Sequence, residues 1–473
     1  MSKNNTYNYL DYYCIVGAGA SAIATIIQFN HHKIKYKVFE KQHNAGGVWQ
    51  SDILKSYSYE GLTTNTPKTA TYIQGYPHEE SVNYYLPFEY VSKYLKAIIA
   101  KECNKQDICY GIHIIEISKK DKYWLIRDQY NNLYYFRGVI ICAGNQAIKN
   151  YNKLTSNSVD EVQQIHSSDY VGYNSIKGKN LIIIGSGQSA IDIIGHGLIH
   201  AKNIIHCTRK IPGWIVPDDT HIKTEDDRKR PLSTILSIIR KFNKLLDYLK
   251  KIVIKVSYQL APEFLLVFFS KLSLRRKIKF TSTNLGFSKW NKEFSLNFYN
   301  ISKDFFLSYR NSGKVIKKKC ISKIDGKNIV FDDGSVLKEI DLIIHATGYK
   351  QPFDFLNNKE DVFHGKYNAL EGLYFGFLSF TKNIFFVGHL YPLGSHWIIH
   401  EMQAKLIACC IKSGLTQAQL VDVFRKEKNL LAYTVYNHGK DFSKYIHIDK
   451  YIKKGERYLK IINSKGSNIS LKS

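Results

Sequence analysis

Two glycine-rich turns, about one domain apart, constrain the fold of this chain more than any other feature. They lie at residues 17–22 (GAGASA) and 185–190 (GSGQSA). Each follows an apolar run typical of a buried parallel strand, at 12–16 and 180–184, and precedes residues that can open a helix. Strand, glycine turn and helix together are typical of a dinucleotide-binding unit. We therefore predict an α/β fold with two Rossmann-like dinucleotide-binding domains, and two nucleotides bound at once.

The first turn has the residues that a pyrophosphate site needs. Gly17 permits the tight turn, Gly19 lets the backbone approach the phosphates, and Ala22 allows close packing of helix on strand. Glu40 ends the next apolar run, 21 positions after Gly19. A carboxylate there accepts hydrogen bonds from a ribose 2′-hydroxyl and repels a 2′-phosphate. The first site is therefore predicted to take FAD or NAD, not NADP.

The second turn differs at the corresponding position. Its next strand, 203–207, ends in Thr208 and Arg209, with no acidic residue. A guanidinium there can bind a 2′-phosphate through a charge-assisted, bidentate pair. This pattern favours NADPH over NADH. The alternative is that Arg209 is only a solvated strand end.

Length and cysteine usage exclude several classes of protein. At 473 residues the chain can form two or three domains with full cores. Its eight cysteines include no Cys-x-x-Cys pair, which argues against a disulfide-reductase flavoenzyme and favours reduced thiols in the cytoplasm. Because no zinc-type spacing appears, we predict no metal site. The polar N-terminus and the short apolar runs predict neither a secretory signal nor a transmembrane helix.

The net charge of +27 is explained by the biased amino-acid composition of the chain. Lysine, asparagine, isoleucine and tyrosine are all abundant, as in AT-rich coding, and no nucleic-acid motif accompanies the charge. We therefore predict no nucleic-acid role. One stretch, about 228–280, combines helical apolar spacing with interleaved lysines and arginines. It would form a basic amphipathic helix that lies on an anionic membrane, packs on the protein body or lines a homodimer contact.

Several further segments agree with a known family in order and spacing. They are residues 46–49, 59–68, 166–170, 341–349, 383–388 and 401–404. Together with the two turns they resemble the class B flavin-dependent monooxygenases, most closely the flavin-containing monooxygenase family, from about residue 12 to 410. Asp160 and Val162 depart from the phenylalanine and glycine that usually begin the identifying motif of that family. Tyr170 stands where related Baeyer–Villiger enzymes tend to have tryptophan, which favours oxygenation of a heteroatom.

The resemblance implies an activity and its cofactors. NADPH would reduce FAD, and O2 would add to give a C4a-hydroperoxyflavin that bound NADP⁺ shields. One oxygen would then pass to a soft nucleophile of a small molecule, an amine nitrogen or a thioether sulfur. The cofactor carries the hard chemistry, so no acid–base dyad is needed. Two alternatives remain: a Baeyer–Villiger monooxygenase acting on ketones, and a non-oxygenating NADPH-dependent flavoprotein.

Asn65 is the predicted catalytic residue beside the flavin. Its carboxamide can donate to the peroxide or the flavin edge without acting as an acid; the alternative is a turn-forming asparagine. For Trp49 the alternative to covering the flavin is a place in the core, and His166 either contacts NADP⁺ or is structural. The predicted cofactor-binding residues are Gly17, Gly19, Ala20, Ser21, Ala22, Glu40, Lys41, Gly47, Val48, Trp49, Thr64, Asn65, Ala143, Gly144, Gly185, Ser186, Gly187, Gln188, Ser189, Ala190, Thr208, Arg209, Ala346, Thr347, Gly348 and Gln403.

The order of the segments also predicts how the domains are arranged. The FAD-binding domain would be discontinuous, 8–168 and 346–445, with the NADPH-binding domain, 169–345, inserted in it. A hairpin signal at 331–335 fits the end of the insert. Residues 446–473 form a basic C-terminal tail, which is expected to be partly disordered from Lys453 onwards. Access to the active site is expected between the two domains.

Overall fold

The computed structural model describes most of the chain. The described residues are 5–50, 58–146, 148–151, 153–155, 162–215, 281, 284–285, 287, 294–357, 359–363, 372–392, 394–425, 437–438, 441–442, 445–446 and 448–470. The predicted amphipathic stretch at 228–280 and Asp160 lie outside these residues, so the membrane, body-packing and dimer alternatives stay predictions. Within the described part of the chain, no helix is both long enough and apolar enough to span a membrane.

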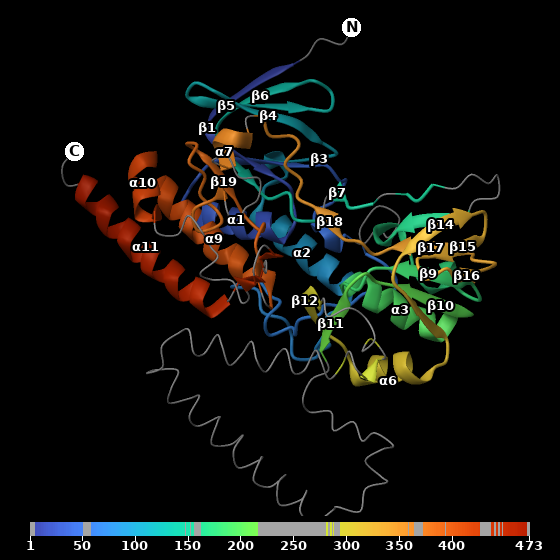
Figure 1. Ribbon diagram of the computed structural model, residues 1–473. Coiled ribbons are helices and arrows are strands. Elements are labelled where there is room, and N and C mark those ends of the chain that lie inside the picture. Colours follow the sequence, from blue (N-terminus) through green and yellow to red (C-terminus); the bar gives the residue numbers. More distant parts are fainter. Residues whose placement is uncertain are drawn as a thin grey trace, which may run out of the picture.

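A seven-stranded sheet forms the centre of the first unit (Figure 1). Its strand order is β3-β2-β1-β6-β5-β4, and β19 pairs with β6. β1, β2, β3, β6 and β19 pair in parallel, whereas β4, β5 and β6 form an antiparallel meander. The bounds are β1 Thr6–Val16, β2 Tyr36–Glu40, β3 Ile108–Tyr110, β4 Ile114–Lys120, β5 Tyr123–Asp128, β6 Leu133–Ile141 and β19 Ile384–Phe386.

Alternate residues of β1 face two different cores. Tyr13 and Ile15 face a core shared with α1 (Ala20–His31), α2 (Phe88–Glu102) and α9 (His396–Lys412). Cys14 and Val16 face a second core, which is completed by the β4–β6 meander and by Phe353, Leu356, Val362, Phe363 and Leu373. A strand buried on both faces reads as a continuous apolar run, which is why 12–16 could be recognised in the sequence.

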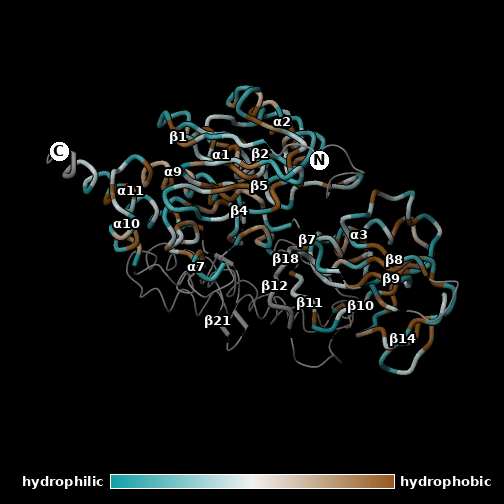
Figure 2. The backbone as a smooth tube through the Cα atoms, turned by 90° about the horizontal axis from the view of Figure 1, so that it is seen from above, coloured by the Kyte–Doolittle hydropathy of each residue, from teal (hydrophilic) through white to brown (hydrophobic). Residues whose placement is uncertain are grey.

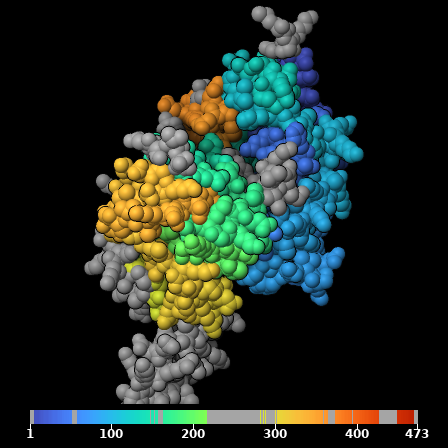
Figure 3. Space-filling model, turned by 90° about the vertical axis from the view of Figure 1, so that its right-hand side faces the viewer, coloured from blue at the N-terminus to red at the C-terminus, as the bar shows by residue number. Residues whose placement is uncertain are grey.

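A five-stranded parallel sheet forms the second unit, in the order β13-β10-β9-β17-β8. One face is covered by α3 and α6, and the other by the antiparallel strands β14, β15 and β16. The bounds are β8 Gln163–His166, β9 Asn180–Ile184, α3 Gln188–His200, β10 Asn203–Cys207, α6 Lys303–Asn311, β13 Val315–Lys318, β14 Ile321–Asp325, β15 Asn328–Phe331, β16 Val336–Leu337 and β17 Leu342–His345. Figure 3 views this unit from the side, where the green and yellow-orange segments lie together although they are far apart in sequence.

The second unit is inserted between β6 and β19 of the first. The chain crosses over through β7 (Ile148–Lys149) and returns through β18 (Tyr349–Lys350), and these two strands pair antiparallel. Figure 2 shows the two units side by side, with β7 and β18 between them. The hairpin signal at 331–335 is confirmed as the turn between β15 and β16. The predicted boundary at residue 168 needs correction, because β8 pairs with β17 and so belongs to the second sheet.

The expectation of partial disorder from Lys453 onwards is wrong for residues 453–470, which belong to the helix α11 (Ile448–Ser470) along α9. Tyr451, Tyr458 and Ile462 are buried, at spacings of seven and four residues that put them on one face of the helix. The Tyr451 ring stacks on Phe375 at 4.1 Å between centroids, and its hydroxyl donates to the Phe375 carbonyl at 2.8 Å. The few apolar residues of this face are separated by many lysines. The composition of the segment therefore predicts disorder, although the spacing of the apolar residues is helical.

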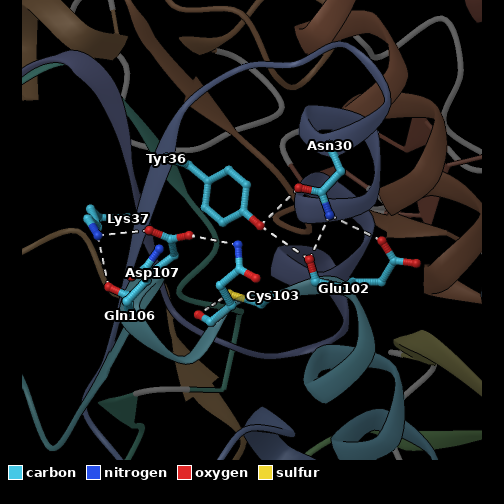
Figure 4. A network of polar contacts seen from close by, with 8 residues as sticks. Asn30, Tyr36, Lys37, Glu102, Cys103, Gln106 and Asp107 are labelled. Atoms are coloured by element: carbon cyan, nitrogen blue, oxygen red, sulfur yellow. Dashed lines mark hydrogen bonds and ion pairs between the residues drawn. The ribbon is translucent and has the colours of Figure 1, made fainter.

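A polar network fastens the end of the first unit that lies away from the glycine turn (Figure 4). The Tyr36 hydroxyl donates to Asn30 Oδ1 at 3.0 Å, and the Asn30 amide donates to the Glu102 carbonyl at 2.6 Å. Lys37 Nζ forms an ion pair with Asp107 at 2.8 Å. These contacts join the ends of α1 and α2 to β2 and so hold the helix that carries the first glycine turn.

The remaining elements are short. They include the 3-10 turns Gly47–Trp49, Ser167–Asp169 and Tyr173–Ser175, and the strand β20 (Tyr391–Pro392). The others are the 3-10 turn Lys105–Asp107, β11 Ile211–Ile215, β12 Phe294–Asn300, α7 Lys359–Phe363, α10 Gln417–Val423, β21 Asn437–His438, β22 Asp441–Phe442 and β23 Tyr445–Ile446.

Candidate dinucleotide-binding site

The first glycine turn lies between β1 and α1 and is pressed against the next strand. Gly17 has a φ of +106°, and a Cβ there would lie 2.6 Å from the Cys142 carbonyl oxygen. The same loop approaches a second glycine segment, since a Cβ on Gly47 would lie 3.1 Å from the Gly19 Cα. No larger residue fits at Gly17 without moving backbone. The turn therefore stays narrow enough for backbone amides to reach a phosphate.

The N-terminus of α1 has the features of a pyrophosphate site. The helix begins at Ala20, and among the described side chains none caps it. Its first N–H groups point out of the helix and carry its positive dipole end, which favours an anion there. Ser21 and Ala22 in this first turn are buried. The residues at the first turn therefore fit the diphosphate of a dinucleotide.

Glu40 is held at the end of β2, beside the turn. It is buried, its Oε2 accepts from the Ala18 amide at 2.7 Å, and its Oε1 accepts from the Gln42 amide at 2.8 Å. Burial raises the pKa of Glu40, and the two amides oppose that effect. Each carboxylate oxygen keeps a second lone pair for a ribose hydroxyl. Lys41, the next predicted residue, is exposed.

Asn65 is exposed, in a loop fixed by its neighbour Thr64. The Thr64 hydroxyl accepts from the Leu86 amide at 3.0 Å and donates to the Thr66 carbonyl at 2.8 Å. Asn65 forms no hydrogen bond with any residue that the structure describes, and its φ is not positive. A turn-forming asparagine usually has one of these two features. The backbone nevertheless bends at residues 65 and 66, so both the catalytic role and the turn alternative for Asn65 stay predictions.

Other predicted residues of the first unit have mixed surroundings. Trp49 is half-buried against the helix core, which favours the core alternative. Gln403 is fully buried, with its Oε1 accepting from the Gly388 amide at 3.0 Å and its Nε2 donating to the Gly376 carbonyl at 3.1 Å. Its amide is engaged by backbone at both ends, so Gln403 holds Gly388 in place. Ala143 and Gly144 follow Cys142, whose carbonyl oxygen meets the Gly17 turn just beyond the end of β6.

The second glycine turn repeats the construction of the first. Gly185 has a φ of +121°, and a Cβ there would lie 2.2 Å from the Ala346 carbonyl oxygen. This contact brings Ala346, which follows β17, against the turn, with Thr347 and Gly348 next in the chain. No described side chain caps α3, which follows Gly187. The Ser186 carbonyl accepts from Trp214 Nε1 at 2.9 Å and fixes the turn from the other side.

Arg209 lies just beyond β10 and is exposed. It forms no hydrogen bond or ion pair within the described part of the chain. Thr208 before it is buried, and its hydroxyl donates to the Lys210 carbonyl at 2.9 Å. β13 ends alongside and adds Lys318, which forms an ion pair with Asp333 at 2.7 Å. The basic strand ends and the free guanidinium suit a phosphate.

His166 is fully buried and both of its ring nitrogens have protein partners. Nε2 lies 3.0 Å from the Gly348 carbonyl, and Nδ1 lies 2.9 Å from the Ser168 hydroxyl. Burial lowers its pKa, so the ring is neutral. Of the two alternatives, the geometry favours the structural one, in which His166 holds the returning chain at Gly348.

A buried polar chain joins the two units, and the sequence reasoning missed it. The Tyr59 hydroxyl donates to Asp192 Oδ2 at 2.6 Å, and Gln188 Nε2 donates to Asp192 Oδ1 at 2.9 Å. Burial raises the pKa of Asp192, and these two hydrogen bonds oppose it. Gln188 opens α3 at the second turn, whereas Tyr59 precedes the loop that ends at Asn65. The contact between Tyr59 and Asp192 spans 133 residues, so no local pattern signals it.

The fold and the two turns define the class: an α/β protein with two dinucleotide-binding units. A family model described as flavin-binding monooxygenase-like matches residues 12–472. The chain belongs to that family, as predicted from the resemblance. This membership also confirms the predicted fold class and the cofactor pair of FAD and NADPH.

Individual relatives are distant. Flavin-containing monooxygenase 5 of Oryctolagus cuniculus is 24% identical, over an alignment that covers 83% of this chain and 71% of the relative's chain. Dimethylaniline monooxygenase [N-oxide-forming] 2 of the same species is 21% identical, covering 88% and 77%. Two solved structures share the fold: S-allyl-L-cysteine S-oxygenase from Allium sativum (TM-score 0.59, 17% identity, 97% and 92% covered) and a cyclohexanone-bound cyclohexanone monooxygenase (TM-score 0.66, 14% identity, 98% of each chain covered).

The Tyr59–Asp192 contact predicts a stability effect. Tyr59→Phe removes one hydrogen bond from a buried carboxylate and should lower the free energy of unfolding by about 1–3 kcal/mol. Chemical denaturation measures it, with Tyr130→Phe as the matched control, because Tyr130 is 61% exposed and its change should cost less than about 0.5 kcal/mol. Equal stability of the two variants would contradict a joining role for Tyr59.

Proposed function

We propose that this protein is an NADPH- and FAD-dependent monooxygenase that transfers one oxygen atom to an amine nitrogen or a thioether sulfur of a small molecule. NADPH, a proton, O2 and the substrate would give NADP⁺, water and the oxygenated substrate. The observation that carries the proposal is the contrast between the two turns. Glu40 would face the ribose of the first nucleotide, and Arg209 would face the ribose of the second nucleotide.

The residues of the first unit would bind FAD. Bound FAD supplies the hydride acceptor and the activation of oxygen. The amides at the start of α1 would hold the diphosphate, and Glu40 would accept hydrogen bonds from the ribose. Asn65 would donate its amide N–H groups at the flavin edge, where a neutral donor orients oxygen without protonating it. These roles agree with the exposure of Asn65 and the fixed loop around it.

The residues of the second unit would bind NADPH. The amides at the start of α3 would face its diphosphate, and Arg209 would meet the 2′-phosphate. Gln188 is held by Asp192, which also accepts from Tyr59 beside the flavin-side loop. A nucleotide bound at the second turn would thereby keep the loop that contains Asn65 in position until the substrate binds.

Oxygenation of nitrogen or sulfur is the preferred chemistry, and ketone oxygenation is the alternative. Relatives that form an N-oxide or oxygenate sulfur favour the first. Cyclohexanone monooxygenase shares the fold and keeps the second open. Tyr170 is fully buried and bonds His196 Nδ1 at 2.9 Å, so it would bias the reaction through packing rather than by contact with substrate.

The test is to reduce the FAD-loaded protein with NADPH, admit O2 without substrate, and follow the flavin spectrum. We expect the return to oxidised flavin to be slow, and to become fast when a thioether or an amine is added. Immediate return with release of peroxide would contradict the proposal and favour a non-oxygenating flavoprotein. Product analysis with a thioether and a cyclic ketone separates the two oxygenation chemistries.

Arg209→Ala should raise the Michaelis constant for NADPH and leave that for NADH nearly unchanged. Loss of one charge-assisted phosphate contact costs about 1.5–3 kcal/mol, or roughly 10- to 150-fold. Steady-state kinetics with both nucleotides measures the difference. Arg310→Ala, which removes an exposed arginine of the same unit, is the matched control. Equal effects of Arg209→Ala on both nucleotides would mean that Arg209 is only a solvated strand end.

Asn65→Ala should leave the rate of flavin reduction largely intact and lower the product formed per NADPH consumed. Loss of one hydrogen bond, about 1 kcal/mol, corresponds to about fivefold. Product and peroxide are measured together with NADPH consumption. Asn328→Ala, at an exposed asparagine in the second unit, is the control. Unchanged coupling in Asn65→Ala would remove Asn65 from the catalytic site.

A further inference from the structure

Two peptide carbonyls of the second glycine turn each accept a hydrogen bond from a buried aromatic side chain. His206 Nε2 lies 2.8 Å from the Gly185 carbonyl oxygen, and Trp214 Nε1 donates to the Ser186 carbonyl oxygen at 2.9 Å. Both side chains are fully buried, His206 on β10 and Trp214 on β11. The two carbonyls therefore point into the interior of the second unit.

The partners of His206 fix the direction of its hydrogen bond. The Gly185 carbonyl can only accept, so Nε2 carries the proton. Nδ1 then accepts from the hydroxyl of the fully buried Tyr309, 2.8 Å away. Burial lowers the pKa of His206 to about 4, so the ring is neutral near pH 7. Two hydrogen bonds thus lead from Tyr309 through His206 to the turn.

Aromatic packing keeps the two donors in place. The His206 and Trp214 rings stack, with 5.3 Å between their centroids and 4° between their planes. The Tyr309 ring meets the Trp214 ring edge-on, at 5.4 Å and 89°. Because rings packed in this way cannot rotate freely, the donors hold each carbonyl in one orientation.

The orientation of the carbonyls also sets that of the amides. In a trans peptide, the C=O group and the N–H group of the next residue point in opposite directions. The Gly185 carbonyl shares a peptide plane with the Ser186 amide, and the Ser186 carbonyl shares one with the Gly187 amide. Both amides therefore point away from the buried donors, and neither has a hydrogen-bond partner among the described residues.

The first glycine turn is held in a different way. There the Ala18 carbonyl accepts from the Gly46 amide at 3.0 Å, and the Ala18 amide donates to Glu40 at 2.7 Å. Ala18 and Ser186 are the second residues of their turns. The first turn thus uses within the protein an amide that the second turn leaves open, and the second turn depends on side chains to keep that amide outward.

We propose that His206 and Trp214 are positioning residues for NADPH, which hold the carbonyls of the second turn inward so that its two outward amides face the diphosphate. The inference rests on the proposed function, since it places NADPH at this turn. Without the two donors, the turn would become ordered only on binding, and the cost of that ordering would weaken the affinity. Both residues act through the turn and not by contact with the nucleotide.

The test compares Trp214→Phe with Trp124→Phe in the full, FAD-loaded chain. Trp124 is equally buried and its Nε1 donates to the Lys382 carbonyl at 3.1 Å, so each variant keeps an aromatic ring and loses one indole hydrogen bond. Calorimetric titration with NADP⁺ should give a dissociation constant about 5- to 30-fold higher in Trp214→Phe, the cost of ordering the backbone of one residue. Trp124→Phe should bind NADP⁺ as the unchanged protein does, although both variants should lower the unfolding temperature.

A fragment of the nucleotide separates positioning from general damage to the second unit. Adenosine 2′-monophosphate has the 2′-phosphate that Arg209 would meet, but it lacks the diphosphate. Its dissociation constant should be unchanged in Trp214→Phe and should rise in Arg209→Ala. His206→Phe should weaken the binding of NADP⁺, and His206→Gln should restore most of the affinity, because its amide N–H would lie near the position of Nε2.

An unchanged dissociation constant for NADP⁺ in Trp214→Phe would overturn the inference. Equal losses of affinity for NADP⁺ and adenosine 2′-monophosphate in that variant would overturn it as well. Failure of the unchanged protein to bind NADP⁺ would instead overturn the proposed function, so the titration of the unchanged protein distinguishes the two failures.

Discussion

The contact on which the rest of the structure depends is a carbonyl oxygen pressed against the first glycine of each turn. The Cys142 oxygen would lie 2.6 Å from a Cβ on Gly17, and the Ala346 oxygen 2.2 Å from a Cβ on Gly185. Both oxygens belong to residues that directly follow a parallel strand next to the turn. Because the carboxyl ends of parallel strands share one edge of a sheet, this contact brings the loops after β6 and β17 to the phosphate sites. One construction is thus used twice, once in each unit.

What differs between the two units is the residue at the end of the next strand. In the first unit two backbone amides hold the buried Glu40, whose carboxylate would repel a ribose phosphate under the proposed function. In the second unit the equivalent edge has Arg209 beside the end of β13, and Arg209 pairs with none of the described residues. Under the proposed function, the same backbone geometry would bind two different nucleotides, one in each unit. An enzyme that passes a hydride from one nucleotide to another needs this separation.

The sequence predicts what depends on neighbours in the chain. The glycine turns, their strands, Glu40 and Arg209 follow local patterns, and a sheet buried on both faces reads as uninterrupted apolar runs. Contacts between distant segments have no such signature. Tyr59 contacts Asp192 across 133 residues, and α11 packs on the core through a few tyrosine and aliphatic side chains that are separated by lysines. The predicted boundary at residue 168 places β8 in the first unit for the same reason. Only the pairing of β8 with β17 shows that it belongs to the second sheet.

The groups that sequence reasoning missed share a physical property, because each is a polar side chain that burial disfavours. Hydrogen bonds from Tyr59 and Gln188 partly offset the free-energy cost of burying the Asp192 carboxylate. His400, in contrast, has no hydrogen-bond partner among the described residues. A protein selected for stability alone would replace such groups by apolar ones of similar shape. Local departures from good packing are expected at functional sites, and here they lie at the two places where the backbone is shaped for phosphate.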